Sequence, residues 1–347
     1  MEPIKFKIRD TEIGGGARVT VQSMTNTDTA DAQATVEQIL KLENAGCEIV
    51  RFSVYNEDCA SAIPYIRSHT NIPLVADIHF DHRLAIAAIE NGVDKVRINP
   101  GNIGSEQKVR ELVAAAKDHC IPIRIGVNGG SLEKDMLQKY GVTAKGMVES
   151  ALSHVAILEK CGFENIVISM KASTVAKTVE ANRLARELTH YPLHLGVTEA
   201  GMGDAAVVKS AIGIGSLLLD GIGDTIRVSL TGDPVREVYA AKRILTAVGL
   251  RSEGVEIVSC PTCGRTRVDL PSIVKKVSDA MPETDKSLRI AVMGCAVNGP
   301  GEAREADLGI AFGSKNAVVF RKGEQLYADK LPGVIDRFIA DVLKELE

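Results

Sequence analysis

The sequence predicts an α/β protein with an N-terminal TIM (β/α)8 barrel and a smaller C-terminal α/β domain. Three observations support this prediction. Short β-branched apolar runs alternate with longer amphipathic segments from residue 19 to about 248, and the runs number eight. This regular alternation ends after about residue 250. We therefore expect a barrel domain over residues 1–252 and a second domain over residues 253–347.

Eight segments have the composition of strands in a parallel sheet. They are VTVQSM at 19–24, EIVRFSV at 48–54, PLVADIHF at 73–80, DKVRINP at 94–100, PIRIGVN at 122–128, NIVISMK at 165–171, LHLGVTE at 193–199 and TIRVSLTG at 225–232. Helical patterns lie between them, and the pattern at 31–46 begins with Asp31 as the expected N-cap and ends at Gly46. An open doubly wound sheet is the alternative, but eight evenly spaced units and the absence of a GxGxxG turn after the first strand favour the barrel.

The C-terminal domain is predicted from a different pattern. A strand should end at the cysteine pair of SCPTCGRT, a helix should follow near 271–281, and a last helix should cover 336–346. Strand-like runs between these helices, LGIAFG and NAVVFRKG, complete a small α/β unit.

Composition limits the function classes. The net charge of −4 gives no basic excess for a nucleic-acid backbone, so we expect no nucleic-acid partner. The N-terminal segment lacks an apolar run of the signal-peptide type, and the longest apolar stretch, at 211–219, is shorter than the roughly 20 residues of a membrane span. We therefore expect a cytoplasmic protein that does not associate with membranes.

The seven cysteines form no regular disulfide framework. Four of them stand in apolar or helical surroundings and are expected to be small buried side chains: Cys47, Cys59, Cys120 and Cys161. The other three lie in the C-terminal domain. In a reducing compartment, closely spaced cysteines are more often metal ligands than disulfide partners.

Charged residues interrupt most of the predicted barrel strands, although strands buried on both faces are normally apolar. The cations are Arg51, Arg97, Arg124, Lys171 and Arg227. Residues two or four positions apart on a strand lie on the same face. This alternation pairs a polar residue with three of the cations, Arg97 with Asn99, Arg124 with Asn128 and Arg227 with Ser229, and it also places Asp77 and His79 on one face.

If these faces point inward, they form a cationic pocket at the C-terminal mouth of the barrel, where active sites of this fold lie. Arginine side chains bind phosphate oxygens in a bidentate manner, so the pocket predicts a small substrate with more than one phosphate. The alternative is that each cation pairs with a carboxylate such as Asp77, Glu199 or Asp224.

Two more residues are candidates for this pocket. Glu199 ends the seventh strand among small residues, where its carboxylate could donate a proton or bind a substrate hydroxyl, or could instead form a salt bridge with Lys171 or an arginine. His79 could bind substrate or orient Asp77.

Cys260, Cys263 and Cys295 give three thiolates, and the fourth ligand decides the kind of site. A structural zinc site would add a cysteine or histidine, but all seven histidines lie at or before His194. Iron–sulfur clusters also use thiolates and accept a non-cysteine ligand on one iron. The candidate is Glu302, because the Gly-Pro-Gly turn before it can bring its carboxylate back toward the sulfurs.

With these motifs in view, the sequence resembles the 4-hydroxy-3-methylbut-2-enyl diphosphate synthases of the methylerythritol phosphate route to isoprenoids, in their two-domain bacterial form. The resemblance covers essentially the whole chain through VQSMTNTDT, ADIHF, RINPGNIG, GVNGGSL, SMKAS, GVTEAG, SLTGDP, SCPTCGRT and GCAVNGPGEA. It implies the reductive ring opening of 2-C-methyl-D-erythritol 2,4-cyclodiphosphate to (E)-4-hydroxy-3-methylbut-2-enyl diphosphate and water.

The resemblance also implies roles for individual residues. A [4Fe-4S] cluster would be bound by Cys260, Cys263, Cys295 and Glu302, and Glu199 would be the acidic residue beside the substrate. The substrate diphosphate would be held by Arg51, Arg97, Arg124, Lys171 and Ser229, with Asn99 and Asn128 alongside. We add Asp77 and His79 to the expected substrate site because they share a face of their strand.

In the family, the active site is shared within a homodimer, and electrons arrive singly from a reduced flavodoxin or ferredoxin. Two other functions remain as alternatives at this point. One is a phosphate-handling barrel lyase with a Schiff base on Lys171 and a structural metal domain. The other is a protein whose cluster only senses oxygen or iron.

Overall fold

The computed structural model describes residues 2–99, 103, 106–130, 132–252, 254–282, 284, 286–295, 301 and 304–347. The chain divides into two compact units, a barrel unit over residues 1–250 and a C-terminal unit over residues 251–347. The boundary predicted from the sequence lies after residue 252.

In the described residues, the barrel unit contains an eight-stranded sheet in which every strand pair is parallel. Its strands are β3 (Thr20–Met24), β4 (Ile49–Ser53), β5 (Leu74–Asp77), β6 (Lys95–Ile98), β7 (Ile123–Asn128), β8 (Ile166–Lys171), β9 (His194–Leu195) and β10 (Thr225–Ile226). The sheet runs from β8 through β3 to β10 and β9. A parallel bridge from Ile168 to Leu193 joins its two ends, so the sheet closes into a barrel.

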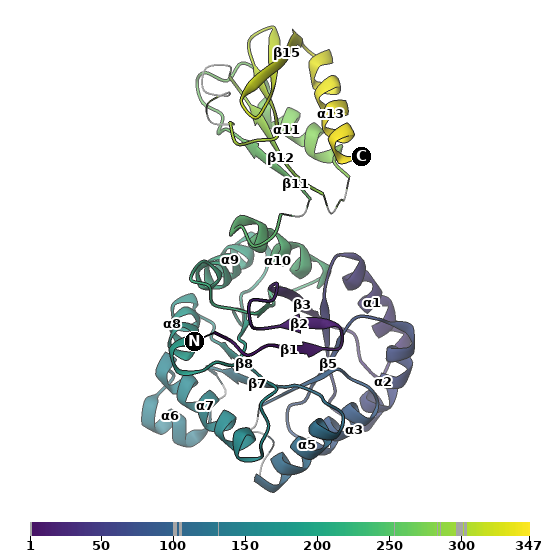
Figure 1. The fold of residues 1–347 in the computed structure, drawn as a ribbon, viewed down its shortest axis with the longest axis vertical. Helices are drawn as coiled ribbons and strands as arrows, with labels where there is room; N and C mark the ends of the chain where they lie inside the picture. The colour runs from purple at the N-terminus through teal and green to yellow at the C-terminus, as the bar shows by residue number, and fades with distance from the viewer. Residues whose placement is uncertain are drawn as a thin grey trace. The chain divides into compact units, whose positions relative to one another are not determined.

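Helices surround this barrel on the outside (Figure 1). They are α1 (Ala32–Asn44), α2 (Glu57–His69), α3 (His82–Glu90), α5 (Glu106–Asp118), α6 (Lys134–Tyr140), α7 (Ala144–Lys160), α8 (Val175–Leu188), α9 (Gly203–Leu219) and α10 (Val235–Ala247). One large apolar cluster fills the space between the strands and helices. The predicted TIM barrel is confirmed, and each predicted strand contains an observed strand.

Local sequence signals explain where the helices begin and end. The side chain of Asp31 accepts a hydrogen bond from the backbone N–H of Ala34 at 3.0 Å, as the predicted N-cap of α1. Gly46 follows the helix with φ of +90°, a backbone conformation that favours glycine. These signals set the return of the chain into β4.

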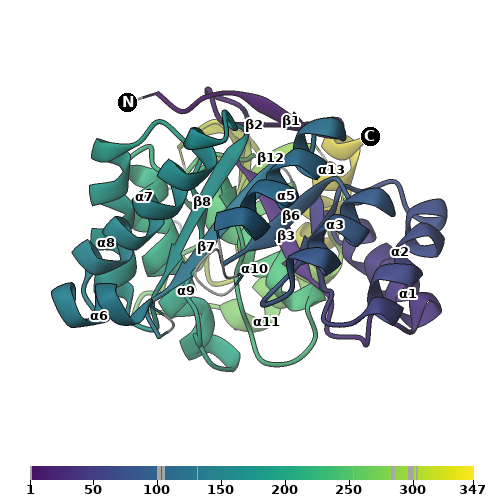
Figure 2. The same ribbon diagram turned by 90° about the horizontal axis from the view of Figure 1, so that it is seen from below.

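An N-terminal hairpin, β1 (Phe6–Ile8) and β2 (Thr11–Ile13), was not predicted from the sequence. Ile8 and Ile13 are fully buried and pack in one cluster with Ile49 of β4 and Val75 of β5. The hairpin therefore covers the N-terminal end of the barrel interior, as Figures 1 and 2 show. Its strands are only three residues long, too short for a periodic pattern to reveal them.

The C-terminal unit is a five-stranded mixed sheet in the order β11, β12, β13, β14, β15 with two helices in the described residues. Its elements are β11 (Gly254–Ser259), α11 (Leu270–Asp279), β12 (Ser287–Met293), β13 (Leu308–Phe312), β14 (Asn316–Arg321), β15 (Glu324–Lys330) and α13 (Gly333–Leu346). The first three strands pair in parallel and the last two antiparallel. This arrangement confirms the predicted small α/β unit.

Of the four cysteines expected to be buried, Cys47 and Cys59 are buried, Cys161 is half-buried and Cys120 is exposed. The prediction is wrong for Cys120 because this residue ends the turn after α5 with a φ of +55°, outside the packed face of the helix. None of the described helices has the length and apolar character that a membrane span requires. The cytoplasmic location stays a prediction.

The packing of the hairpin leads to a testable expectation. Ile13→Ala should lower the free energy of unfolding of the barrel by about 2–5 kcal/mol, because it removes a fully buried side chain and leaves a cavity. Scanning calorimetry of the full chain measures this change, with the exposed Val208→Ala as the matched control. An equal and small effect of both substitutions would show that the hairpin does not support the barrel.

Candidate active site

A polar cavity of about 130 Å³ opens among the carboxyl ends of the barrel strands, and we call it the barrel cavity. It is lined by Arg51, Asp77, His79, Arg97, Arg124, Asn128, Ser169, Lys171, Thr198, Arg227 and Ser229. All but one of the nine residues predicted to contact substrate are in this lining, and the exception is Asn99. The prediction that these polar faces point inward is therefore confirmed.

Strand geometry brings these side chains together. Cα pairing aligns Ser53, Asp77, Arg97 and Arg124 across β4 to β7, so neighbouring strands present polar residues at one level of the barrel. Glycine makes room among them. A Cβ atom at Gly126 would lie 2.3 Å from Nε of Arg97, which means that only glycine at this position lets the guanidinium stay where it is.

Asp77 is the acidic residue of the barrel cavity. Its carboxylate accepts a hydrogen bond from Nη1 of Arg97 at 3.0 Å and lies 3.7 Å from Nε of Arg51. Burial alone would raise the pKa of Asp77, but the charges of Arg51 and then Arg97 outweigh it and lower the pKa to about 2. Asp77 is thus ionised at neutral pH and holds two cations in place.

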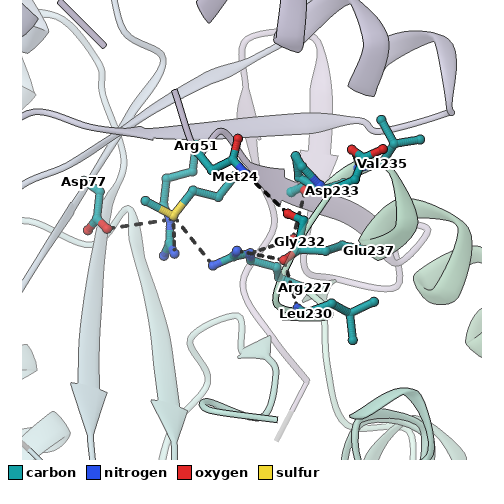
Figure 3. A network of polar contacts seen from close by, with 12 residues as sticks. Met24, Arg51, Asp77, Arg227, Leu230, Gly232, Asp233, Val235 and Glu237 are labelled. Carbon is teal, nitrogen blue, oxygen red and sulfur yellow. Dashed lines mark hydrogen bonds and ion pairs between the residues drawn. The ribbon is translucent and has the colours of Figure 1, made fainter. Parts of the chain in front are cut away.

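A second group of contacts centres on the thioether of Met24 (Figure 3). Nε and Nη2 of Arg51 lie 3.1 and 2.9 Å from this sulfur, and Nη1 of Arg227 approaches it at 3.6 Å. Behind Arg227, the buried carboxylate of Glu237 on α10 accepts hydrogen bonds from Nε and Nη2 at 3.2 and 3.1 Å. The sulfur is a weak, uncharged acceptor, so it orients Arg51 without neutralising it.

The remaining two cations of the barrel cavity have neutral partners. Nη1 of Arg124 donates to the amide oxygen of Gln22 at 3.1 Å, and Nζ of Lys171 lies 3.3 Å from Nε2 of His194. Neither cation forms an ion pair with a carboxylate in the described part of the chain.

Five cations line the cavity, whereas Asp77 and Glu237 are the carboxylates paired with them among the described residues. The alternative prediction that each cation is neutralised by its own carboxylate is therefore wrong. Burial and then the neighbouring arginines lower the pKa of Lys171 well below its ordinary value. The side chains that line the cavity thus carry more positive than negative charge.

Two predicted residues, Asn99 and Glu199, lie outside the lining of the cavity. Asn99 is buried beyond the end of β6, outside the cavity lining, and its amide oxygen has no hydrogen-bond partner among the described residues. Glu199 is exposed in the loop after β9, has a φ of +54°, and accepts a hydrogen bond from Lys209 Nζ on its backbone carbonyl at 3.2 Å. Its carboxylate is outside the lining of the cavity and stays a predicted catalytic group.

Several residues of the site were missed by reasoning that followed charges alone. They are Met24, Ser169, His194, Thr198 and Glu237. For Ser169 and His194 the sequence carried the same signal as for the arginines, because both are polar residues within an apolar strand. Met24 and Glu237 gave no such signal, because a methionine at a strand end and a glutamate in a helix are ordinary.

The cysteines of the C-terminal unit lie at the ends of neighbouring strands. Parallel pairing of Ser259 with Val292 places Cys260, directly after β11, beside the end of β12, which Cys295 follows. The backbone N–H of Gly294 donates to Sγ of Cys260 at 3.2 Å. The two cysteine-bearing segments are therefore in contact.

The second cysteine of the pair, Cys263, is exposed and accepts hydrogen bonds at its thiol. A backbone hydrogen bond from Arg265 lowers the pKa of the Cys263 thiol, and the Cys263 N–H donates to Oγ1 of Thr266 at 3.2 Å. Glu302 lies outside the described residues. Across the residues that are described, no three histidine, cysteine, aspartate or glutamate side chains are arranged to hold a metal ion. The donor set still fits a thiolate-bound cluster, because backbone N–H groups already point at sulfur.

Two family models match this chain, one over each unit. A family model described as the GcpE TIM-barrel domain matches residues 4–242, and one described as the GcpE protein C-terminal domain matches residues 256–344. The chain belongs to the GcpE family. The predicted resemblance is thus confirmed over both units.

Curated GcpE-family relatives carry one functional name. A protein of Caldanaerobacter subterraneus subsp. tengcongensis is 56% identical over 344 residues, which are 99% of this chain and 96% of that protein. One of Clostridium perfringens is 56% identical over 339 residues, or 97% of each chain. Both are named 4-hydroxy-3-methylbut-2-en-1-yl diphosphate synthase (flavodoxin). The predicted enzyme class is confirmed, and these relatives give no support to the lyase or sensor alternatives.

Solved structures show the breadth of the barrel fold beyond the GcpE family. Dihydropteroate synthase from Stenotrophomonas maltophilia aligns with a TM-score of 0.53 at 17% identity, over 71% of this chain and 98% of that one. At this level of identity the likeness concerns the fold alone.

Below the cavity, Lys95 of β6 gives a prediction about stability. Its Nζ is fully buried without a hydrogen-bond partner in the described structure, and burial, followed by Arg124, lowers its pKa well below the ordinary value. Lys95→Met should therefore raise the free energy of unfolding by about 1–3 kcal/mol at neutral pH.

The sign of the pH dependence follows from proton binding. The folded chain releases the Lys95 proton at a lower pH than the unfolded chain does, so rising pH stabilises the wild type and not Lys95→Met. The stability difference measured by calorimetry should shrink as the pH rises toward the ordinary lysine pKa of about 10.4. A difference that is constant with pH, or a destabilised variant, would contradict the lowered pKa of Lys95.

Proposed function

We propose that this protein catalyses the reductive ring opening and dehydration of 2-C-methyl-D-erythritol 2,4-cyclodiphosphate to (E)-4-hydroxy-3-methylbut-2-enyl diphosphate, a step in isoprenoid precursor biosynthesis. The barrel cavity carries the proposal for substrate binding. Five cations and several neutral donors line it, but few carboxylates accompany them, so the cavity suits a compact, multiply charged phosphate ester.

Within this proposal, the residues of the cavity have different roles in binding the diphosphate. Arg51, Arg97 and Arg124 contact the diphosphate oxygens, with Lys171 as a point charge at the end of β8. Asn128, Ser229 and His79 offer further polar contacts, and Asn99 lies just outside the lining. Asp77 acts on the substrate indirectly, since its carboxylate is occupied by Arg51 and Arg97.

We assign Glu199 the role of the acidic group that positions or protonates a substrate oxygen. The left-handed backbone at this residue turns the chain at the carboxyl end of β9, where a side chain can reach a bound substrate. The support for its chemical role is the family resemblance of the GVTEAG motif.

The C-terminal unit is proposed to hold a [4Fe-4S] cluster on Cys260, Cys263, Cys295 and Glu302. The N–H group of Gly294, already directed at Cys260 Sγ, would stabilise thiolate charge. When bound, the cluster supplies electrons to the reaction one at a time. Glu302 is proposed to act both as a ligand and in catalysis because a carboxylate ligand is more readily exchanged than a thiolate.

The proposed assembly follows the same family resemblance. Residues 1–252 would form the substrate-binding domain and residues 253–347 the cluster domain, with the active site shared between the subunits of a homodimer. The name of both relatives includes flavodoxin, which supports reduced flavodoxin, or a ferredoxin in its place, as the electron donor. We propose a cytoplasmic enzyme, because free thiolates persist in a reducing compartment.

The cofactor proposal is tested by composition. Protein purified without oxygen should contain about four irons and four acid-labile sulfides per chain, and should give an electron paramagnetic resonance signal after reduction. Stoichiometric zinc without sulfide, persisting after anaerobic reconstitution, would exclude the cluster and revive the lyase alternative. In that case borohydride trapping on Lys171 becomes the deciding experiment.

Substitutions test the two halves of the site separately. Arg124→Ala should raise the Michaelis constant for the cyclodiphosphate by about 10- to 100-fold through lost charged hydrogen bonds, and Arg124→Lys should have a smaller effect. Glu302→Ala should keep much of the cluster yet remove turnover. The exposed Arg110→Ala is the control for loss of an arginine. Full activity of Arg124→Ala or Glu302→Ala would remove that residue from the mechanism.

A further inference from the structure

Three residues on neighbouring strands form a buried chain of hydrogen bonds below the barrel cavity. Lys171 ends β8, His194 begins β9 and Thr225 begins β10, with His194 and Thr225 as direct partners in the parallel register. The imidazole and the hydroxyl-bearing side chain are fully buried, and Lys171 is 8% exposed. Only the lysine of this chain lines the cavity.

The contacts determine which nitrogen of His194 carries the proton. Nζ of Lys171 lies 3.3 Å from Nε2 of His194, and Nδ1 of His194 lies 2.7 Å from Oγ1 of Thr225. When Lys171 is protonated, as a bound anion favours, its ammonium can only donate, so Nε2 is then the accepting nitrogen. The neutral imidazole then has its hydrogen on Nδ1 and donates it to the threonine hydroxyl.

The surrounding charges keep this imidazole neutral. Burial, followed by the charges of Arg124 and Lys171, lowers the pKa of His194 well below its ordinary value. An imidazolium here would place another cation beside the ammonium. His194 therefore offers a permanent uncharged acceptor.

A second feature of the same strand shapes the space for Lys171. Gly196 is two residues after His194 and so presents the same face of the chain. A Cβ atom at Gly196 would lie 2.8 Å from Nζ of Lys171 and 2.7 Å from the backbone oxygen of Arg227. Glycine at this position therefore leaves room for the Lys171 side chain, whose Nζ contacts Nε2 of His194.

We propose that His194 is a positioning residue for the diphosphate site. Its imidazole holds the Lys171 ammonium toward the bound anion without neutralising the positive charge of the lysine. A carboxylate in the same place would hold the lysine more firmly but would remove one positive charge from the site. The Nδ1–H bond to Thr225 fixes the tautomer that makes the histidine an acceptor. This inference rests on the proposed function, because it assumes that the cavity takes a diphosphate.

The test compares variants of the anaerobically purified full chain. His194→Leu should raise the Michaelis constant for the cyclodiphosphate by about tenfold or more while changing kcat less, because a hydrogen bond to a charged group is lost. His194→Gln, which returns an acceptor near the Nε2 position, should recover most of that loss. The exposed His190→Leu, on the same segment, is the matched control and should leave the Michaelis constant unchanged.

A pH series separates positioning from a general packing defect. Charged groups that act on Lys171 include Arg51, Arg97, Arg124 and Arg227, and Asp77 is the carboxylate of the same cavity. Affinity for inorganic pyrophosphate, measured by calorimetry, should weaken as pH rises and Lys171 loses its proton. In His194→Leu the midpoint of this loss should move to lower pH, because the ammonium has lost its acceptor, and in His194→Gln it should not.

A double-mutant cycle completes the design. In a Lys171→Met background, His194→Leu should add no further rise in the Michaelis constant, since its effect passes through the lysine. If His194→Leu does not fold, Thr225→Val tests the same chain by removing the acceptor that fixes the tautomer, and should move the midpoint in the same direction.

The outcomes for the two proposals are distinguishable. If the wild type converts the cyclodiphosphate but His194→Leu keeps both the Michaelis constant and the pH midpoint, the positioning role is overturned. An equal loss in His194→Leu with and without Lys171 also overturns it. If the wild type shows no conversion, the proposed function fails, and the pyrophosphate series alone then decides whether His194 supports Lys171.

Discussion

Positive charge inside the barrel exceeds the negative charge that accompanies it, and the arrangement of the barrel interior follows from this excess. Five cations line the cavity, while Asp77 and Glu237 are the carboxylates paired with them in the described residues. Each buried, uncompensated charge is costly. The large apolar cluster around the strands and the hairpin over the N-terminal end provide the stability that permits such an interior.

Besides the ion pairs with Asp77 and Glu237, four of the five cations contact uncharged partners that orient them and leave their charge in place. The sulfur of Met24 receives Arg51 and Arg227, the amide of Gln22 receives Arg124, and the imidazole of His194 receives Lys171. Glycines on the same strands provide the room that the long side chains need. Such partners satisfy donors but do not reduce the attraction of the site for an anion.

The sequence predicted the barrel well because its strands are short β-branched runs, and the interruptions by Arg51, Arg97 and Arg124 fall on one face. The same alternation located most of the cavity lining. It could not find contacts between distant segments, such as Met24 with Arg227 or Arg227 with Glu237, because these depend on the closure of the barrel and the packing of α10. The hairpin was missed because packing on Ile49 and Val75, and not a local pattern, makes its short strands stable.

An anion in the barrel cavity would change the energetics of the whole unit. Bound phosphate oxygens would supply hydrogen-bond acceptors and negative charge that the cavity side chains lack. A ligand that binds only the folded barrel raises its free energy of unfolding, and tighter binding raises it more. Adding carboxylates would make the free protein more stable, yet they would compete with the substrate for the same guanidinium groups. Asp77 shows the compromise, since one carboxylate between Arg51 and Arg97 orders two cations and still leaves a net positive charge between them. The repulsion among the cations that destabilises the empty barrel is relieved when a diphosphate binds, and this relief adds to the binding free energy.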